Sequence, residues 1–132
     1  RSEPLREDAL AGRWRAYDEA AIQEARKAGK TVFIDFTADW CITCKANETL
    51  VLHRTSTEAL FDQYGAKLFK GDWTTGDPVI TAALHRFGAE GVPLYVVLPA
   101  DPSGEPIVLP TLLTSGIVEE ALQQAASVRQ PE

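Results

Sequence analysis

Short apolar runs that alternate with helical patterns constrain the fold of this chain more than any other feature. The run Thr31–Phe36 (TVFIDF) is rich in β-branched and aromatic residues and too short for a typical helix, so it predicts a buried strand. Three similar runs predict strands at Lys67–Trp73, Leu94–Leu98 and Ile107–Leu109. The last two flank Ala100–Glu105 (ADPSGE), whose turn-forming residues predict a hairpin.

Five other segments carry the marks of an α-helix. Asp18 is a suitable N-cap for the first of them, and Gly29 follows its end. Asp77-Pro78 opens the fourth with an N-cap residue and a proline in the first turn. The predicted helices span Asp18–Ala28, Cys41–His53, Thr57–Tyr64 after a Thr55-Ser56 cap, the segment from Asp77 to Gly88, and Gly116–Ala126.

The order of these elements predicts an α/β fold. An αβαβ beginning followed by a ββα ending is typical of a central mixed β-sheet flanked by helices on both faces. The 132 residues suit one compact domain better than two. We expect that domain to span residues 14–127, with a polar lead-in or linker at 1–13 and a tail at 128–132.

The formal net charge of −6 argues against two classes of binding partner. A net-acidic surface argues against nonspecific nucleic-acid binding and against docking on anionic lipid. No apolar run approaches the roughly 20 residues of a membrane-spanning helix, and no leader sequence opens the chain. Because the chain contains no methionine, we expect a mature chain or a domain cut from a larger protein.

The two cysteines of the chain, Cys41 and Cys44, lie after a predicted buried strand and at the start of a predicted helix. A helix N-terminus offers unpaired N–H groups and the positive end of the dipole, and both favour a thiolate over a thiol. Since the thiolate is the attacking species in disulfide exchange, we predict that Cys41 is the nucleophile. Cys44, one turn further in, suits the resolving role.

Other uses of two cysteines fit less well. A disulfide that only stabilised the fold would join distant segments, whereas this loop spans four residues. Buried inert thiols would not be expected beside Trp40 and Lys45. A zinc site would also need His53 and His85, whose spacing matches no usual zinc pattern, so we expect no metal and no cofactor other than the cysteine pair.

Two acidic residues are candidate proton carriers. Asp35 interrupts the apolar strand, where a buried carboxyl would have a raised pKa and could exchange a proton with Cys44. The alternative is that Asp35 faces solvent on an edge strand. Glu48 follows Cys44 by four residues and therefore shares its helical face, although it could equally be a solvated helix residue. Asp39, just before the helix, is a candidate cap.

The active-site segment resembles that of thioredoxins. The run Phe33–Lys45 has the strand aspartate Asp35, Trp40 before the first cysteine and Lys45 after the second. Gly91-Val92-Pro93 resembles the loop that places a cis-proline against the disulfide in thioredoxins. Without this resemblance a trans bond would be expected, because most X–Pro bonds in folded proteins are trans. The resemblance implies a thioredoxin-like fold, a cis Val92-Pro93 bond, and substrate binding by Trp40, Val92 and Pro93.

A narrower resemblance is to the C-terminal periplasmic domain of the DsbD family of transmembrane reductases, including the ScsB type. Three segments carry it: TADWCITCKANE (Thr37–Glu48), GDWTTGDPVITAALHRFG (Gly71–Gly88) and GVPLYVVLP (Gly91–Pro99). Glu48 matches the acid that follows the second cysteine there. Ile42-Thr43 replaces the Gly-Pro of thioredoxin, so the redox potential of thioredoxin cannot be carried over.

This resemblance implies an electron relay that acts as a protein-disulfide reductase. A membrane-embedded donor domain would reduce this domain, which would then reduce periplasmic thiol–disulfide partner domains. The expected location is the periplasmic side of the bacterial inner membrane, as a monomeric soluble domain of a membrane protein. Two alternatives stay open: a free-standing periplasmic reductase or oxidant of the cytochrome c maturation type, and a redox-silent binding module.

Overall fold

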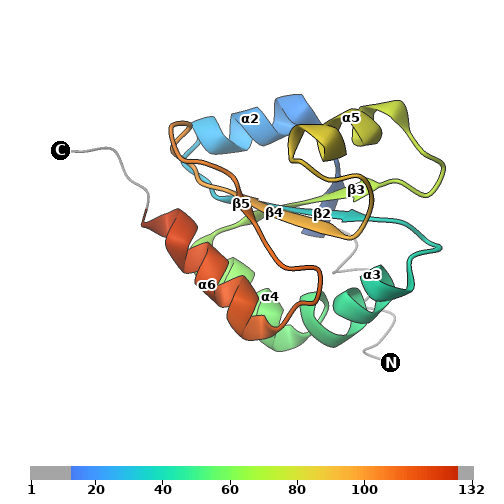
Figure 1. The fold of residues 1–132 in the computed structure, drawn as a ribbon. Coiled ribbons are helices and arrows are strands. Elements are labelled where there is room, and N and C mark those ends of the chain that lie inside the picture. The colour runs from blue at the N-terminus through green and yellow to red at the C-terminus, as the bar shows by residue number, and fades with distance from the viewer. Residues whose placement is uncertain (1–12, 128–132) are drawn as a thin grey trace.

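A mixed five-stranded sheet forms the centre of the computed structural model, which describes residues 13–127 (Figure 1). The strand order is β1-β3-β2-β4-β5. β1 and β2 run parallel to β3, whereas β4 runs antiparallel to both β2 and β5. The strands are β1 (Trp14–Ala16), β2 (Val32–Thr37), β3 (Lys67–Asp72), β4 (Leu94–Leu98) and β5 (Ile107–Val108).

Helices cover both faces of this sheet, as the sequence predicts (Figure 1). One face carries α2 (Glu19–Lys27) and α5 (Pro78–Arg86). The other carries α3 (Ile42–Asn47), the π-helical segment η1 (Glu48–Leu52), α4 (Thr55–Tyr64) and α6 (Ser115–Ala126). Within residues 13–127, no helix is both long enough and apolar enough to cross a membrane.

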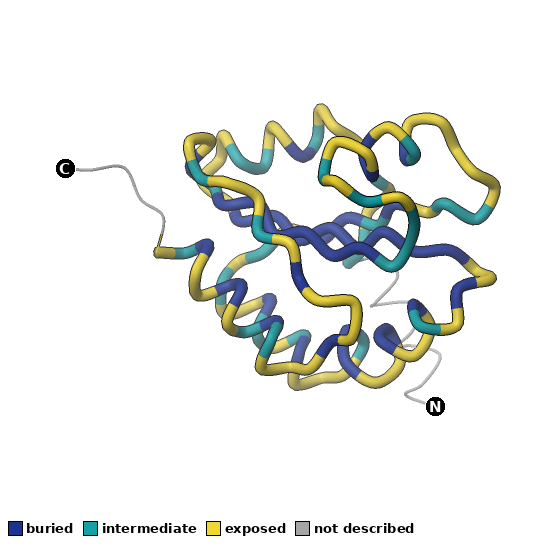
Figure 2. The backbone as a smooth tube through the Cα atoms, viewed as in Figure 1, coloured by how far each residue is buried: buried dark blue, intermediate teal, exposed yellow. Residues whose placement is uncertain are grey.

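Strand β2 is the centre of two hydrophobic layers. All six of its residues are buried, and Figure 2 shows the inner strands in the colour of buried residues. Phe33 packs into the layer beneath α4 and α6, whereas Ile34 and Phe36 pack into the layer beneath α2 and α5. Because side chains alternate along a strand, Asp35 faces the same side as Phe33. That side also carries α3 and η1.

Two of the predicted N-caps and two of the predicted C-terminal glycines are present. The carboxylate of Asp18 accepts the N–H of Ala21 at 3.1 Å, and that of Asp77 accepts the N–H of Val79 at 2.8 Å. Left-handed backbone at Gly29 and Gly88 follows the ends of α2 and α5. The predicted Thr55-Ser56 cap is wrong: α4 begins at Thr55, and the N-cap residue Arg54 makes no side-chain cap.

The sequence reading missed β1 and the break in the second helix. β1 has three residues, two of them exposed, so it carries no alternating pattern that could reveal it. Its first residue, Trp14, packs edge-on against Phe33 and Phe61. The helix predicted over Cys41–His53 is divided, because its second half is the π-helical η1, which no simple sequence signal marks.

The structure describes residues 13 to 127, so the predicted lead-in and tail lie almost wholly outside the described residues. The exception is Arg13, whose guanidinium forms two hydrogen bonds with the carboxylate of Asp62, at 2.8 and 3.1 Å. Arg13 is therefore attached to α4 and is part of the folded domain.

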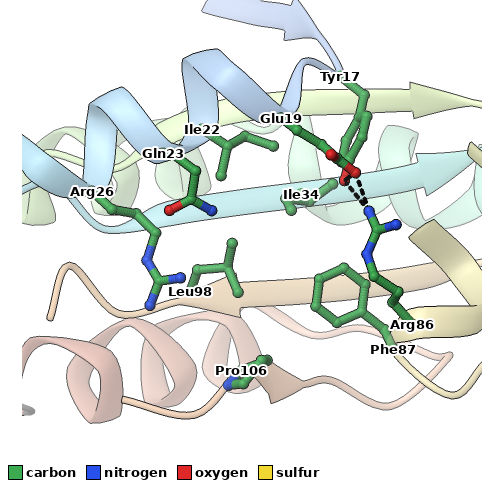
Figure 3. A pocket seen from close by; sticks show the side chains of 10 residues that line it. All are labelled: Tyr17, Glu19, Ile22, Gln23, Arg26, Ile34, Arg86, Phe87, Leu98 and Pro106. Carbon is green, nitrogen blue, oxygen red and sulfur yellow. Dashed lines mark hydrogen bonds and ion pairs between the residues drawn. The ribbon is translucent and has the colours of Figure 1, made fainter. Parts of the chain in front are cut away.

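A groove opens on the α2 and α5 side of the sheet (Figure 3). Ile22, Ile34 and Leu98 supply its apolar lining, and an ion pair between Arg86 and Glu19 lies at its edge. Arg26 donates to the carbonyl oxygen of Pro99 at 2.7 Å. No residue of the predicted site lines this groove, so the chemistry predicted from the sequence lies elsewhere.

Candidate active site

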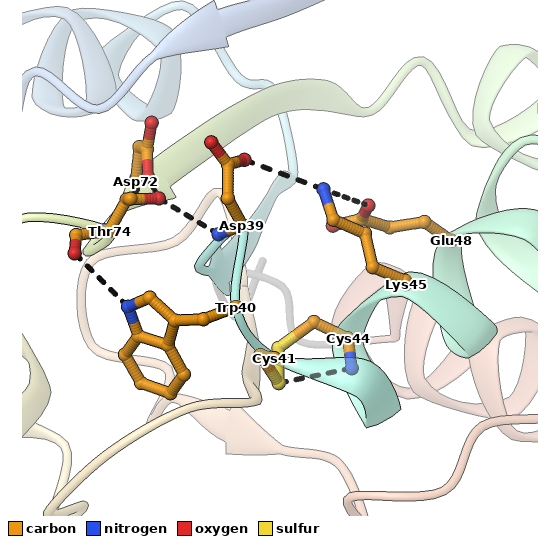
Figure 4. A network of polar contacts seen from close by, with 8 residues as sticks. All are labelled: Asp39, Trp40, Cys41, Cys44, Lys45, Glu48, Asp72 and Thr74. Atoms are coloured by element: carbon orange, nitrogen blue, oxygen red, sulfur yellow. Dashed lines mark hydrogen bonds and ion pairs between the residues drawn. A yellow bond between two sulfur atoms is a disulfide. The ribbon is translucent and has the colours of Figure 1, made fainter.

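Cys41 and Cys44 form a disulfide at the first turn of α3 (Figure 4). Cys41 is the N-cap residue of this helix, with extended backbone, and its Sγ accepts the backbone N–H of Cys44 at 3.1 Å. Cys41 keeps 7% of its surface exposed, whereas Cys44 is fully buried. Only Cys41 therefore presents an edge to an incoming molecule, and Cys44 can react only with what Cys41 has bound.

The position of Cys41 favours its thiolate once the disulfide is reduced. The first-turn N–H groups of α3 lie at the sulfur, and the positive end of the helix dipole adds to them. The chain reaches this position because β2 ends at Thr37 and a short loop, residues 38–40, leads directly into the helix. The local geometry can thus support an attacking sulfur at Cys41.

Trp40 is held beside the disulfide by the segment that follows β3. Its indole Nε1 donates to the carbonyl oxygen of Thr74 at 3.0 Å, and its ring centroid lies 6.0 Å from that of Trp73 (Figure 4). The Oγ1 of Thr74 also accepts the N–H of Asp39 at 2.8 Å. Although 59% of its surface is exposed, Trp40 is therefore fixed in place.

Asp39 does not cap the helix, because Cys41 occupies the N-cap position. Its carboxylate instead lies 3.5 Å from Nζ of Lys45, and the same ammonium lies 3.9 Å from Oε1 of Glu48 (Figure 4). The expectation of a cap is wrong because the chain turns into the helix two residues later. Lys45 thus places a positive charge between an exposed acid and a buried one.

Asp35 and Glu48 lie within the protein. Their exposed fractions are 1% and 5%, which decides between the alternatives that the sequence leaves open: neither residue is solvated. Burial raises the pKa of Asp35 well above its ordinary value, and the charge of Glu48 and a hydrogen bond with it raise that pKa further. Asp35 therefore holds a proton at pH values where an exposed aspartate would have lost it.

The Val92-Pro93 peptide bond is cis, as the resemblance implies. Val92 packs against the small cluster formed by Ala38, Cys41 and Cys44. The loop before β4 therefore lies directly against the disulfide. Backbone atoms of this loop are close to any chain that approaches Cys41.

The two histidines lie away from the sulfurs in different settings. His53 is half-buried with its ring centroid 6.4 Å from that of Trp14, and burial lowers its pKa. His85 is exposed on α5. Among residues 13–127, no three or more His, Cys, Asp or Glu side chains are grouped so as to hold a metal ion.

Sequence reasoning missed two buried polar residues between α3 and the sheet. Asn47 is 5% exposed and donates to the hydroxyl oxygen of Tyr95 at 2.8 Å. Tyr95 lies in an apolar run that predicts a strand, and Asn47 lies within a predicted helix, so neither position carries a signal of its own. Only the packing of β4 against α3 brings them together.

The chain matches a family described as thioredoxin-like over residues 13–100. It is 34% identical to the Pseudomonas aeruginosa protein named thiol:disulfide interchange protein DsbD 1, over 83% of this chain and 18% of that protein. The corresponding Vibrio cholerae protein, DsbD, is 31% identical over 77% of this chain and 16% of its own length. The chain thus spans less than a fifth of these two curated relatives.

Solved structures show the same similarity. The reduced form of the Neisseria meningitidis DsbD C-terminal domain superposes with a TM-score of 0.64 and 28% identity, covering 82% of this chain and 96% of that one. Chloroplastic thioredoxin z superposes with a TM-score of 0.66 at 19% identity, over 88% of this chain and 96% of that one, which supports the fold alone. A cysteine pair on this scaffold is consistent with thiol–disulfide exchange.

The raised pKa of Asp35 predicts a specific pH dependence of stability. The folded carboxyl binds its proton more tightly than the unfolded one, so the free energy of unfolding falls as pH rises above the ordinary value of 3.8. Asp35→Asn removes this group. We expect the stability advantage of this variant over wild type to grow as the pH rises from about 4 to 7, as measured by urea denaturation of the disulfide form.

Asp62→Asn is the control of opposite sign. A hydrogen bond from Arg13 lowers the pKa of Asp62, so this variant should lose a little stability above pH about 4 rather than gain it. A difference between Asp35→Asn and wild type that does not change with pH would contradict the assignment.

Proposed function

Because this chain belongs to the thioredoxin-like family, we propose that it is a thiol–disulfide oxidoreductase domain with Cys41 as nucleophile and Cys44 as resolving residue. The observation that carries the proposal is the disulfide at the first turn of α3, in which Cys41 keeps 7% of its surface exposed and Cys44 is fully buried. The pair itself is the redox centre, and no other cofactor is required.

The reaction runs in two exchanges. In the reduced domain, the Cys41 thiolate attacks one sulfur of a partner disulfide, and the other partner sulfur leaves as a thiolate. The Cys44 thiol then gives up its proton and attacks Sγ of Cys41, which releases the second partner sulfur. The partner gains two electrons as two thiolates, which take up protons from the solvent, and the domain returns to the Cys41–Cys44 disulfide.

Asp35 and Glu48 supply the group that takes the proton of Cys44. Their carboxyls are buried on the α3 side of the sheet, and Glu48 follows Cys44 by about one helical turn. Since burial raises the pKa of Asp35 well above its ordinary value, this carboxyl can both accept a proton and return one at a higher pH than an exposed carboxyl can. Each residue acts on Cys44, either directly or through the other.

Substitution of each cysteine separates the two roles. Cys41→Ser should reduce insulin disulfides no faster than the buffer, with dithiothreitol as electron source, because the attacking sulfur is gone. Cys44→Ser should also fail to turn over but should accumulate a mixed disulfide on Cys41, visible by non-reducing mass spectrometry. Exchange by the Cys41→Ser variant would overturn the proposed function.

The surface around Cys41 provides the docking site for the partner. Ile42 is 85% exposed directly after the nucleophile, and Trp40 is 59% exposed directly before it. Large exposed apolar side chains at the edge of a reactive atom favour contact with another protein surface. The backbone of Val92, next to cis-Pro93, lies against the disulfide and is positioned to pair with the partner chain.

Ile42→Lys tests the docking site without touching a sulfur. We expect kcat/KM for insulin reduction to fall about tenfold, mainly through KM, since a buried apolar contact is worth about 1.4 kcal/mol or more. Reaction with a small aromatic disulfide reagent should change far less, because that reagent needs no docking. The matched control is Val108→Lys on the edge strand β5, where the apolar side chain is 50% exposed; this change should alter neither rate. Equal losses with both disulfides would contradict docking at Ile42.

The named relatives support a proposal for the direction of electron flow and for the partners. The curated relatives are thiol:disulfide interchange proteins, and the structural relative is a C-terminal domain of such a protein. We infer that a membrane-embedded donor domain reduces Cys41–Cys44 and that periplasmic thiol–disulfide domains receive the electrons. The domain would then act as a reductase on the periplasmic side of the inner membrane.

Equilibration with glutathione tests this direction. A reductase that passes electrons onward should show a reduction potential below about −200 mV, whereas an oxidant lies near −120 mV, roughly the value for the strong oxidant DsbA. The ratio of dithiol to disulfide is measured by alkylation and mass spectrometry over a series of glutathione ratios. A value near −120 mV would exclude the reductase relay and leave a free-standing oxidant.

A further inference from the structure

Trp73, the residue that follows β3, contacts both segments that flank the disulfide. Its ring centroid lies 6.0 Å from that of Trp40. A Cβ atom at Gly91 would lie 3.6 Å from Cζ3 of Trp73, which is an ordinary van der Waals distance. The benzene edge of the indole therefore faces the backbone of Gly91, the first residue of the cis-proline loop (Gly91–Pro93).

Two hydrogen bonds fix Trp73 relative to β2 and α5. Its backbone N–H donates to the carbonyl oxygen of Thr37, the last residue of β2, at 2.8 Å. Its indole Nε1 donates to Oγ1 of Thr81 on α5, also at 2.8 Å. Because an indole N–H can only donate, the oxygen of Thr81 accepts, and the hydroxyl hydrogen of Thr81 is free to bond to the carbonyl oxygen of Asp77 at 2.9 Å. The orientation of the indole ring is thus set by Thr81.

The next residue, Thr74, holds Trp40 from the same segment (Figure 4). Its carbonyl oxygen accepts the indole N–H of Trp40 at 3.0 Å. The carboxylate of Asp72 accepts the backbone N–H of Thr74 at 3.0 Å and also accepts its hydroxyl. These bonds fix the turn that carries the acceptor for Trp40. Trp40 therefore cannot move without losing contacts with both Trp73 and Thr74.

We propose that Trp73 is a positioning residue that sets the spacing between Trp40 and the cis-proline loop, and thereby the width of the site that a partner chain enters. This inference rests on the proposed function, in which Trp40 and the backbone of Val92 contact the partner. Val92 packs against the cluster that contains the disulfide, so a chain that pairs with Val92 lies next to Cys41. Trp73 carries no reacting group and acts through the two segments that it contacts.

A fixed spacing should matter for binding rather than for the exchange of sulfurs. An extended chain that pairs with a neighbouring backbone lies about 4.8 Å from it, and its side chains must fill the remaining space. A gap of roughly 0.5–1 Å already loses a quarter to a half of a van der Waals contact. A small displacement of Trp40 or of the cis-proline loop should therefore weaken the binding of a polypeptide, whereas Cys41 would keep its reactivity.

Trp73→Phe tests this proposal, because it shortens the ring and removes its N–H group. We expect kcat/KM for insulin reduction to fall about fivefold, mainly through KM, and the rate with a small aromatic disulfide reagent to change by less than about twofold. Trp14→Phe is the matched control. Trp14 packs in the opposite hydrophobic layer, so the same substitution there should leave both rates unchanged.

Thr81→Val tests the orientation of the ring while leaving the ring in place. It removes the acceptor of the indole N–H, so we expect the KM for insulin to rise about two- to threefold. Thr81→Ser keeps a hydroxyl and should restore the wild-type KM. If Trp73→Phe does not fold, this pair of variants decides the question: an unchanged KM in Thr81→Val would then overturn the inference.

A double variant shows whether Trp73 acts through Trp40. In a Trp40→Ala background, Trp73→Phe should raise the KM for insulin by a clearly smaller factor than in wild type, because one of the two spaced segments has lost its side chain. An equal factor in both backgrounds would contradict the inference, since Trp73 would then contact the partner itself or act on the whole fold. Equal losses with insulin and with the small reagent would contradict it as well.

Hydrogen exchange reports on Trp40 without any disulfide exchange. In the disulfide form of Trp73→Phe, the indole N–H of Trp40 should exchange with water about fivefold faster than in wild type, as measured by NMR saturation transfer from the solvent. In Trp14→Phe its exchange should not change. An unchanged rate in Trp73→Phe would count against positioning. Because this measurement needs no turnover, that outcome differs from a failure of the proposed function, in which wild type reduces neither disulfide.

Discussion

The pairing of β2 between β3 and β4 is the constraint on which the site depends. β2 is buried along its whole length, and its register brings Asp35 opposite Lys70 on one side and Tyr95 on the other. The carbonyl oxygen of Thr37, the last residue of the strand, accepts the N–H of Trp73 at 2.8 Å. The loop that delivers Cys41 to the start of α3 therefore leaves from a fixed point, between the segments that hold Trp40 and the cis-proline.

That arrangement buries the carboxyl groups of Asp35 and Glu48, although burying a charged carboxylate is energetically unfavourable. A buried carboxylate without a partner costs several kcal/mol, so a protein gains nothing in stability from two of them. Burial keeps a proton on Asp35 to a higher pH than on an exposed aspartate, which removes its negative charge while the proton is bound, and the ammonium groups of Lys45 and Lys70 offset part of that charge once it forms. The retained charge is consistent with a role in chemistry rather than in folding, since an apolar pair of similar size would pack at lower cost.

The sequence predicts the parts of this site that depend on local spacing. Cys41 and Cys44 are apparent from their separation and from the strand before them, and the caps at Asp18 and Asp77 follow from residue type. The sequence does not predict β1, because three mostly exposed residues form no alternating pattern. It does not predict η1 either, because a π-helical turn has no characteristic composition. The contact between Asn47 and Tyr95 joins residues 48 positions apart, so it exists only in the packed structure.

These buried groups also explain why weak dipoles can tune the exchange. When the proton of Cys44 passes to the carboxyl pair, a buried carboxylate is replaced by a buried thiolate. Both charges lie in the same poorly solvated region, so the large cost of burying a charge appears on both sides and mostly cancels. What remains is the difference between the dipoles and charges that face each group. The first turn of α3 favours the thiolate, and the ammonium of Lys45, 3.9 Å from Glu48, favours the carboxylate, so modest changes in either shift the balance.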